Sequence, residues 1–264
     1  MSDDRQILRV EDLKIYFGSG DDEVRAVDGV SFNLNRGEIV ALVGESGSGK
    51  SLSALALTRI TPRAALIKGG RVLFKDMDLM QRNEDELRIC RGKHISYIFQ
   101  EPMSSFNPVF TIGAQIKEVL FIHKRVAAGN KEVSNLLEKV QLPSQLMHKY
   151  PHEMSGGQLQ RCMIAMALAS SPDILVADEP TTALDVTIQK EILELIVKLC
   201  KEEQLSILMI THNFGVVSAV ADRVYVLQKG RVVEEGIKEQ VLYNPRDAYT
   251  KKLLGAVPQL PKKD

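Results

Sequence analysis

Two glycine-containing segments of the chain have the residue types that bind phosphate groups. Residues 44–51 read Gly-Glu-Ser-Gly-Ser-Gly-Lys-Ser, and residues 155–158 read Ser-Gly-Gly-Gln. In the first segment, glycines let backbone N–H groups turn toward an anion, the lysine supplies a charge for the β- and γ-phosphates, and the final serine supplies a hydroxyl for Mg²⁺. The pattern predicts a phosphate loop with contacts from Gly44, Ser46, Gly47, Gly49, Lys50 and Ser51.

The segments around this loop have the pattern that a phosphate loop requires. The continuous apolar run Ile39–Val43 precedes it and is typical of a strand buried on both faces, and a helix is expected from Lys50. The N-terminus of that helix would add its dipole to the anion site. A chance Gly/Ser loop would lack this context, so we predict a nucleoside triphosphate site.

A pair of carboxylates ends a second apolar segment. Asp178 and Glu179 follow Ile174–Ala177, and the carboxyl ends of parallel strands are where α/β folds bind ligands. Asp178 would hold Mg²⁺ beside the phosphate loop, and Glu179 would polarise the water that attacks the γ-phosphate. The alternative is a strand that ends in a solvated turn, which the phosphate loop argues against.

The second glycine segment presents a mismatch. Ser155–Gln158 opens a different helix, expected from Gln158, and its sequence favours contact with a γ-phosphate from outside. A monomer has no nucleotide facing this second segment. The mismatch predicts a dimer in which each site is shared, and hence an ATP-driven switch.

Composition restricts the class of protein. The chain has 264 residues, 44% of them hydrophobic, and its 34 Lys and Arg balance 34 Asp and Glu, so nothing indicates a nucleic-acid or anionic-membrane surface. The widely separated Cys90, Cys162 and Cys200 indicate reduced thiols and not a disulfide framework or a zinc site. No apolar run approaches the about 18–20 residues that span a bilayer, so we expect a soluble chain; if it acts at a membrane, other chains would hold it there.

The order of predicted elements indicates an α/β fold with a helical insert. Strands are expected before and after a helical stretch between residues 112 and 170, so that a βαβ-type core is interrupted and then resumes. Gly69-Gly70 is expected to break the chain before a short strand at 71–74. The other expected strands are 7–17, 24–34, 39–43, 95–99, 173–178 and 206–211, with a hairpin of 224–227 and 231–233; the expected helices are 112–126, 132–140, 158–169, 186–203 and 249–256.

These motifs, in the order in which they occur with Gln100, Asp185 and His212, resemble the nucleotide-binding subunit of ATP-binding cassette (ABC) transporters over nearly the whole chain. The Ser-Gly-Gly-Gln signature is diagnostic of that family. The resemblance implies an ABC-type phosphate-loop NTPase in a single domain, residues 1–264. Its parts would be a RecA-like parallel-sheet core with an N-terminal antiparallel β subdomain (1–101 and 172–230), a helical subdomain (102–171) and a C-terminal extension (231–264).

The resemblance also implies roles for further residues. Phe17, with Tyr16 as its neighbour and rival, would stack on adenine; strand alternation lets only one of the two face the base. Gln100 would sense the γ-phosphate and Mg²⁺ at the entry to the helical part, although an exposed polar strand end would look the same. His212 would contact the γ-phosphate and hold Glu179 and water in line.

Two segments would act across the dimer. Ser155, Gly156, Gly157 and Gln158 would cover the nucleotide held by the opposite subunit, with Ser155 and Gly157 donating to its γ-phosphate. Asp185 would cross the interface near the partner's catalytic water. Alternatively it would be the N-cap of the helix that begins at Val186, and one residue can have both roles.

Several segments are more similar to one branch, the oligopeptide, dipeptide and nickel importer ATPases. They are 26–32, 43–51, 99–108, 177–187 (which includes Ala183-Leu184-Asp185) and 244–250. This implies a bacterial-type importer subunit that binds ATP and Mg²⁺ and energises uptake of peptides, or of nickel or metal chelates, by ATP-driven dimer closure. The implied partners are a sister ATPase, in a heterodimer or a homodimer, two transmembrane permeases and an extracytoplasmic solute-binding protein, with the chain at the cytoplasmic face of the plasma membrane. Residues 102–108 are expected to contact a permease.

Departures from the branch are few. Met154 replaces the usual Leu before the signature, and Asn213 follows His212 where Asp is usual. Some members carry a cysteine cluster for an iron–sulfur centre near the C-terminus; the sequence given has none, so no such cofactor is expected.

The alternative function is that of a soluble ABC ATPase of DNA repair or translation. Such proteins usually have tandem cassettes or a long coiled-coil insert, and the sequence shows neither. Because this subunit does not touch the cargo, its sequence leaves peptide and nickel open.

Overall fold

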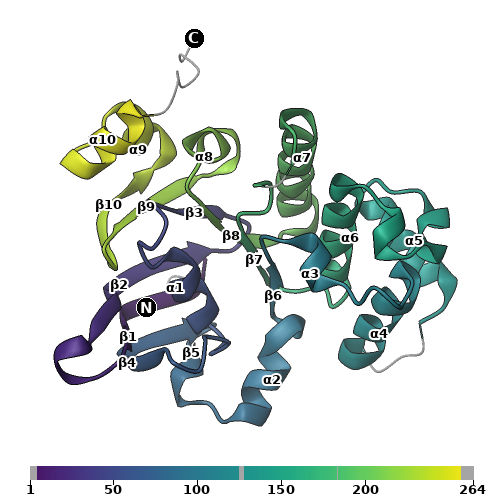
Figure 1. Ribbon diagram of the computed structural model, residues 1–264, viewed down its shortest axis with the longest axis horizontal. Coiled ribbons are helices and arrows are strands. Elements are labelled where there is room, and N and C mark those ends of the chain that lie inside the picture. The colour runs from purple at the N-terminus through teal and green to yellow at the C-terminus, as the bar shows by residue number, and fades with distance from the viewer. Residues whose placement is uncertain (1–4, 125–127, 183, 257–264) are drawn as a thin grey trace.

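A six-stranded sheet forms the centre of the molecule in the computed structural model, which describes residues 5–124, 128–182 and 184–256 (Figure 1). Its strand order is β10-β9-β3-β8-β7-β6, and every neighbouring pair is parallel except β9 and β10. The carboxyl ends of the five parallel strands therefore meet at one edge. The bounds are β3 (Ile39–Val43), β6 (Ile95–Ile98), β7 (Ile174–Asp178), β8 (Ser206–Thr211), β9 (Arg223–Gln228) and β10 (Arg231–Ile237).

An antiparallel sheet of order β2-β1-β4-β5 packs beside this centre; its strands are β1 (Gln6–Phe17), β2 (Val24–Asn35), β4 (Leu66–Phe74) and β5 (Met77–Asp78). The prediction that Gly69-Gly70 breaks the chain before a strand was wrong, because both glycines lie within β4. Gly70 has φ +101° and approaches β1 so closely that a Cβ would lie 2.6 Å from Leu13 Cα. The strand continues there because the residue has no side chain.

The two faces of the central sheet belong to two hydrophobic cores. Val40 and Leu42 of β3 pack with the antiparallel sheet and with α1 (Lys50–Ala56). Ile39, Ala41 and Val43 point to the other core, to which helices between β6 and β7 and the later helices of the chain contribute. This alternation explains why β3 is apolar at every position.

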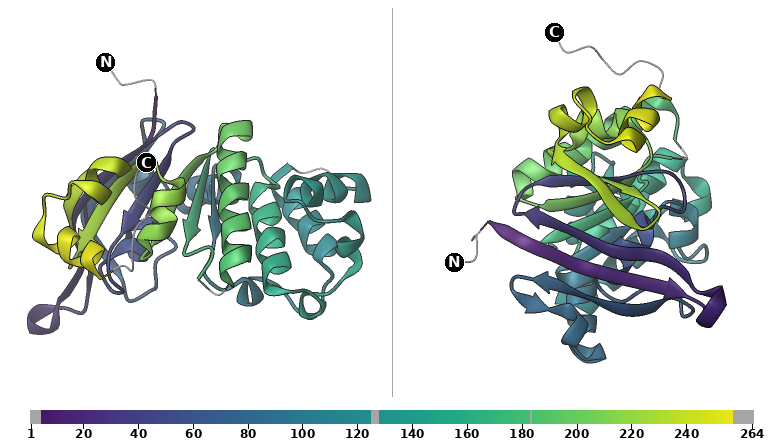
Figure 2. Two further views of the ribbon diagram at one scale, coloured as in Figure 1. Left: turned by 90° about the horizontal axis from the view of Figure 1, so that it is seen from above. Right: turned by 90° about the vertical axis from the view of Figure 1, so that its left-hand side faces the viewer.

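The helices between β6 and β7 form one end of the molecule. Figures 1 and 2 show α4 and α5 at the end opposite α9 and α10. They belong to the chain between β6 and β7, where a helical insert was predicted; its residue boundaries stay a prediction. The helices of this part are α3 (Pro102–Ser105), α4 (Ile112–Lys124), α5 (Asn130–Lys139) and α6 (Gly156–Leu168). The end of the predicted helix 112–126 and residue Ala183 lie outside the described residues.

The remaining helices are α2 (Glu84–Lys93), α7 (Val186–Glu203), α8 (Phe214–Val220), α9 (Lys238–Tyr243) and α10 (Ala248–Gly255). Both α9 and α10 come after β10 and lie near the edge of the sheet that β9 and β10 form (Figure 1). Among the described residues, no helix combines the length and the hydropathy that crossing a bilayer requires.

Candidate nucleotide site

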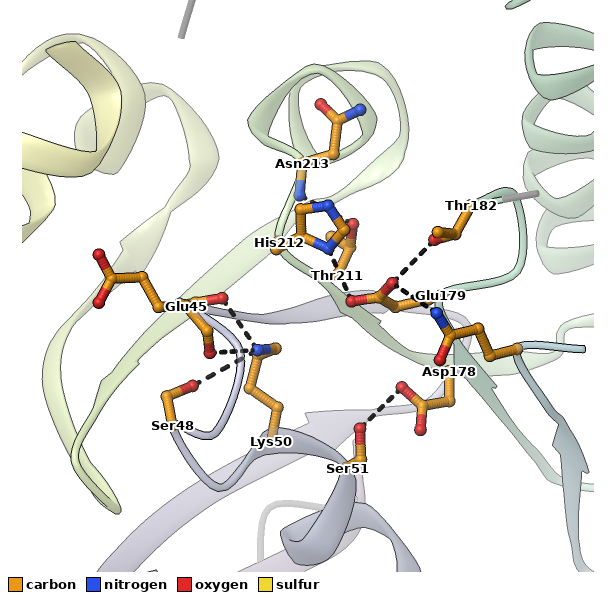
Figure 3. A network of polar contacts seen from close by, with 12 residues as sticks. Glu45, Ser48, Lys50, Ser51, Asp178, Glu179, Thr182, Thr211, His212 and Asn213 are labelled. Carbon is orange, nitrogen blue, oxygen red and sulfur yellow. Dashed lines mark hydrogen bonds and ion pairs between the residues drawn. The ribbon is translucent and has the colours of Figure 1, made fainter. Parts of the chain in front are cut away.

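The predicted phosphate loop connects β3 to α1 at the carboxyl edge of the central sheet (Figure 3). Its bends depend on residues without side chains. A Cβ on Gly44 would lie 2.2 Å from the carbonyl oxygen of Leu227, and one on Gly49, which has φ +99°, would lie 2.6 Å from that of Ala26. The loop is thus packed against β9 and β2, and its backbone conformation is fixed from outside as well as by its own sequence.

The side chain of Lys50 is buried inside this loop. Its ammonium donates to the carbonyl oxygens of Gly44 and Glu45, both at 2.9 Å, and lies 3.4 Å from Ser48 Oγ. Burial lowers the pKa of Lys50 from its ordinary value, and the nearby carboxylates of Glu179 and Asp178 raise it in part. A cation placed in this way faces the cavity where phosphate oxygens would bind.

Ser51 and Asp178 form a second polar contact, with Ser51 Oγ donating to Asp178 Oδ1 at 3.0 Å. Burial raises the pKa of the Asp178 carboxyl, and the charge of neighbouring Glu179 raises it further, against the effects of Ser51 and Lys50. A hydroxyl and a carboxylate are hard oxygen ligands of the kind that Mg²⁺ prefers, with phosphates and waters completing its shell. The described residues contain no cluster of three or more His, Cys, Asp or Glu that could hold a metal ion without such help.

Three polar side chains of the site converge on Glu179 (Figure 3). Its Oε1 lies 2.7 Å from His212 Nδ1, and its Oε2 accepts from Thr182 Oγ1 at 2.8 Å and from Gln100 Nε2 at 3.4 Å. Burial raises the pKa of this carboxyl, but the bonds from His212 and Thr182 and the charges of His212 and Lys50 outweigh it, so the pKa is lowered overall. An oriented, ionised carboxylate beside a phosphate loop can accept a proton from water.

Thr182 also contacts Glu179, although it is not among the site residues predicted from the sequence. It lies three residues after Glu179, and its N–H donates to the carbonyl oxygen of Glu179 in the turn that follows β7. The turn brings the Thr182 hydroxyl back to the Glu179 carboxylate. In the sequence, a hydroxyl residue three positions after Glu179 is the only sign of this contact.

These residues line one cavity of about 860 Å³, together with Phe17 and the phosphate loop. The structure separates the two aromatic candidates. Phe17 lines the cavity, whereas the Tyr16 hydroxyl donates to Asp28 Oδ1 at 2.8 Å, on the same carboxylate that Arg231 contacts. Of the pair, Phe17 is therefore the one positioned to meet a nucleotide base.

The Ser155–Gln158 segment does not belong to this cavity. Among the described residues, none of its members lines the cavity. Ser155 is exposed and begins α6 as its N-cap: Gln158 N–H donates to Ser155 Oγ at 3.3 Å, and Ser155 N–H donates to the Gln158 side chain at 3.1 Å. The helix thus starts at Gly156, two residues before the predicted start. Gly157 packs closely on Ile188 of α7.

Comparison with known proteins agrees with this arrangement. Residues 27–182, more than half of the chain, match the family described as ABC transporter. The chain belongs to the ABC transporter family. It is 48% identical over 260 residues to the oligopeptide transport ATP-binding protein OppD of Bacillus subtilis (strain 168), covering 97% of this chain and 73% of that protein. It is 46% identical to the dipeptide transport ATP-binding protein DppD of the same organism, covering 97% of this chain and 78% of that protein.

Solved structures of ABC cassettes have the same fold. One is a dimeric ATP-binding cassette in a post-hydrolysis state, bound to ADP and phosphate. It is 28% identical, with a TM-score of 0.78, over 88% of this chain and 99% of that one. The predicted α/β fold is confirmed, and as a member of the ABC transporter family the chain is an ATPase.

Asp185 has a defined structural role in this ABC cassette. Its Oδ1 accepts the N–H of Ile188 at 3.0 Å, so it caps α7. The side chain is exposed at the same time, which leaves it accessible to a second subunit. Within the chain Asp185 is therefore the N-cap of α7, as the alternative interpretation expected. Its role across a dimer stays a prediction.

Proposed function

We propose that this ABC ATPase is the ATP-hydrolysing subunit of a membrane importer whose cargo is a peptide. The relatives named for oligopeptide and dipeptide transport support this proposal. Nickel or metal chelates remain compatible with the same nucleotide site. The observation that carries the hydrolytic part is the position of Glu179, held by His212 and Thr182 beside Lys50 and the Ser51–Asp178 pair.

In this proposal each part of the site has a defined task in hydrolysis. Lys50 and the loop amides bind the phosphates, and Phe17 stacks on the base. Ser51, Asp178 and Gln100 hold Mg²⁺, which when bound neutralises charge on the phosphates. Glu179 accepts a proton from the attacking water, and His212 keeps the carboxylate in line and contacts the γ-phosphate.

The exposed signature supports a shared site. Ser155 and Gly157 would donate to the γ-phosphate of an ATP bound by another cassette, and Asp185 would approach the same place from its exposed position on α7. Two ATP molecules would then hold two cassettes together until hydrolysis removes the γ-phosphate contacts. We propose a non-identical sister ATPase as the second cassette, with a homodimer as the other possibility.

Two permeases would hold the cassettes at the membrane and receive the motion. Residues 102–108 and their neighbours are our choice for that contact. Met103, Val109 and Phe110 are each at least half exposed, which supports a docking role for this face of the helical part. The solute-binding protein would act through the permeases.

Reconstitution tests this function. The chain is co-expressed with candidate permeases and a sister ATPase and placed in liposomes, and ATP hydrolysis is measured with peptide-loaded and then with nickel-loaded binding protein. Stimulation by the peptide-loaded protein supports the proposal, and stimulation by the nickel-loaded protein alone would transfer it to metal import. Recovery of the chain only with ribosomes or DNA would favour a soluble ABC ATPase instead.

A further inference from the structure

The C-terminal helix α10 reaches the phosphate loop through Tyr249. The N–H of Glu45, the second residue of the loop, donates to Tyr249 Oη at 3.1 Å. Tyr249 is only 7% exposed, and it belongs to the same hydrophobic core as Ile39, Ala41 and Val43 of β3. A residue far along the chain from the loop thus provides a buried acceptor for one of the loop's amides.

Both backbone polar groups of Glu45 are hydrogen-bonded within the chain. Its carbonyl oxygen accepts from the ammonium of Lys50 at 2.9 Å, while its N–H is bound by Tyr249. The backbone of the residue is therefore held on both sides. Figure 3 shows the Glu45 side chain pointing away from Lys50, so Lys50 contacts Glu45 through its backbone, while the Glu45 carboxylate interacts with the Tyr249 hydroxyl.

The helix that carries Tyr249 is itself anchored. Glu234 of β10, 8% exposed, accepts the N–H groups of Arg246 at 2.7 Å and Asp247 at 3.2 Å. Asp247 caps α10 by accepting the N–H of Tyr249 at 2.8 Å. Through these contacts β10, a strand of the central sheet, fixes the position and direction of Tyr249.

The same helix also lines the nucleotide cavity. Leu253, one turn after Tyr249, and Ala256 at the end of the helix are among the residues around the 860 Å³ cavity that holds Lys50 and Phe17. Two separate observations, the bond to the loop and the wall of the cavity, therefore connect α10 with the nucleotide.

We propose that α10 is part of the nucleotide site, with Tyr249 as a positioning residue that holds the Glu45 limb of the phosphate loop and Leu253 as a wall of the cavity. This rests on the proposed function, since it takes the ligand to be an adenine nucleotide. Tyr249 acts through the loop: when its hydroxyl is absent, the peptide that orients the Lys50 ammonium is held on one side only. Burial raises the pKa of the Tyr249 hydroxyl, so it stays protonated and neutral through the pH range of such experiments.

The chain offers a matched control. Tyr225 is also buried, and its hydroxyl also accepts a backbone N–H, that of Asn33 at 3.3 Å, but it does not line the nucleotide cavity. Tyr249→Phe leaves the Glu45 N–H without its acceptor, and Tyr225→Phe leaves the Asn33 N–H and one Arg223 N–H, 3.1 Å from the Tyr225 hydroxyl, without theirs. A purely structural role predicts that both variants lose stability and that neither changes nucleotide binding, so a loss of nucleotide affinity in Tyr249→Phe alone reports on positioning.

The test uses isothermal titration of the full chain with MgADP and steady-state ATPase kinetics of the assembled complex. We expect both variants to lower the thermal midpoint. Only Tyr249→Phe should weaken ADP binding and raise KM for ATP, by about three- to ten-fold, the value of one neutral hydrogen bond. Its kcat should stay within about two-fold of wild type, because the contact acts on binding and not on the transition state alone.

A second pair tests the wall. Leu253→Ala should weaken ADP binding, whereas Leu254→Ala, in the same helix but absent from the cavity lining, should affect only stability. Wild-type ADP affinity in Tyr249→Phe and Leu253→Ala, with stability lowered as in their controls, would overturn the inference. Failure of the wild-type chain to bind ADP would count against the proposed function instead.

Discussion

Nδ1 of His212 lies 2.7 Å from Oε1 of Glu179, and the two residues follow the ends of neighbouring parallel strands. Glu179 adopts φ +47°, a left-handed conformation that is unfavourable for a residue with a side chain. Its N–H donates to the carbonyl oxygen of Ile210 at 2.9 Å, which stabilises this backbone. The strained conformation turns the carboxylate toward the cavity and toward His212, as expected where strain serves a function.

The first prediction concerns the proposed base. Glu179→Gln keeps the shape of the side chain and removes its capacity to accept a proton. We expect ATP turnover of the assembled complex to fall by about 10²–10⁴-fold, the range for loss of general base catalysis, with ATP binding retained. Single-turnover hydrolysis and nucleotide titration measure the two quantities. Transport at the wild-type rate would remove Glu179 from this role.

The second prediction concerns pH. The active form of Glu179 is the carboxylate, and its lowered pKa means that kcat should persist on acidification to below the ordinary range of a glutamate, about 4.3. Thr182→Val deletes one hydrogen bond that lowers this pKa, so the acid limb of the kcat profile should move to higher pH. Thr182→Ser keeps a hydroxyl and should leave the limb near its wild-type position. An identical acid limb in all three proteins would contradict the assignment.

The third prediction separates the two aromatic candidates. Phe17→Ala removes the ring that lines the cavity and should weaken ATP binding by about 1–3 kcal/mol, the range for stacking of a base on an aromatic side chain. Tyr16→Phe removes only the bond to Asp28 and should bind ATP as wild type does. Titration with ATP in both variants decides between them, and the reverse order of effects would exchange their roles.

The fourth prediction tests Asp185 for a role beyond its cap. Asn is as good an N-cap as Asp, so Asp185→Asn should keep the unfolding free energy, whereas Asp185→Ala should lose about 1 kcal/mol. If the carboxylate also acts across the dimer, ATP turnover should fall in both variants. Full turnover in Asp185→Asn would leave the residue as a helix cap alone.

Much of the fold was predictable because its elements have strong periodicity. The bounds of β3, β8 and α7 agree with the sequence prediction, since continuous apolar runs and a helical stripe define them. The short helices α3, α8 and α9 have too few residues for a period to be recognised. In α2 the period is interrupted by non-helical Arg91 and Gly92, although a capping box of Asn83 and Glu86 marked its start.

The site was predictable where it depends on strand ends. Parallel strands bring Gln100, Asp178, Glu179 and His212 to one edge whatever the details of packing, and the phosphate loop starts there too. The sequence could not predict contacts that depend on the path of a turn or of the C-terminal segment. Thr182 reaches Glu179 through a tight turn, and Tyr249 reaches the loop only because β10 and Glu234 direct the C-terminal helices toward it.

The position of Lys50 has a consequence for how mutants of this protein are interpreted. Its ammonium cross-links two carbonyl oxygens of the loop, those of Gly44 and Glu45. Replacing the lysine therefore removes an internal brace of the loop as well as a charge for the phosphates, and the two losses cannot be separated in one binding measurement. Variants at Glu179, which leave the brace intact, are the cleaner means of trapping bound ATP and of asking what the nucleotide does before it is cleaved.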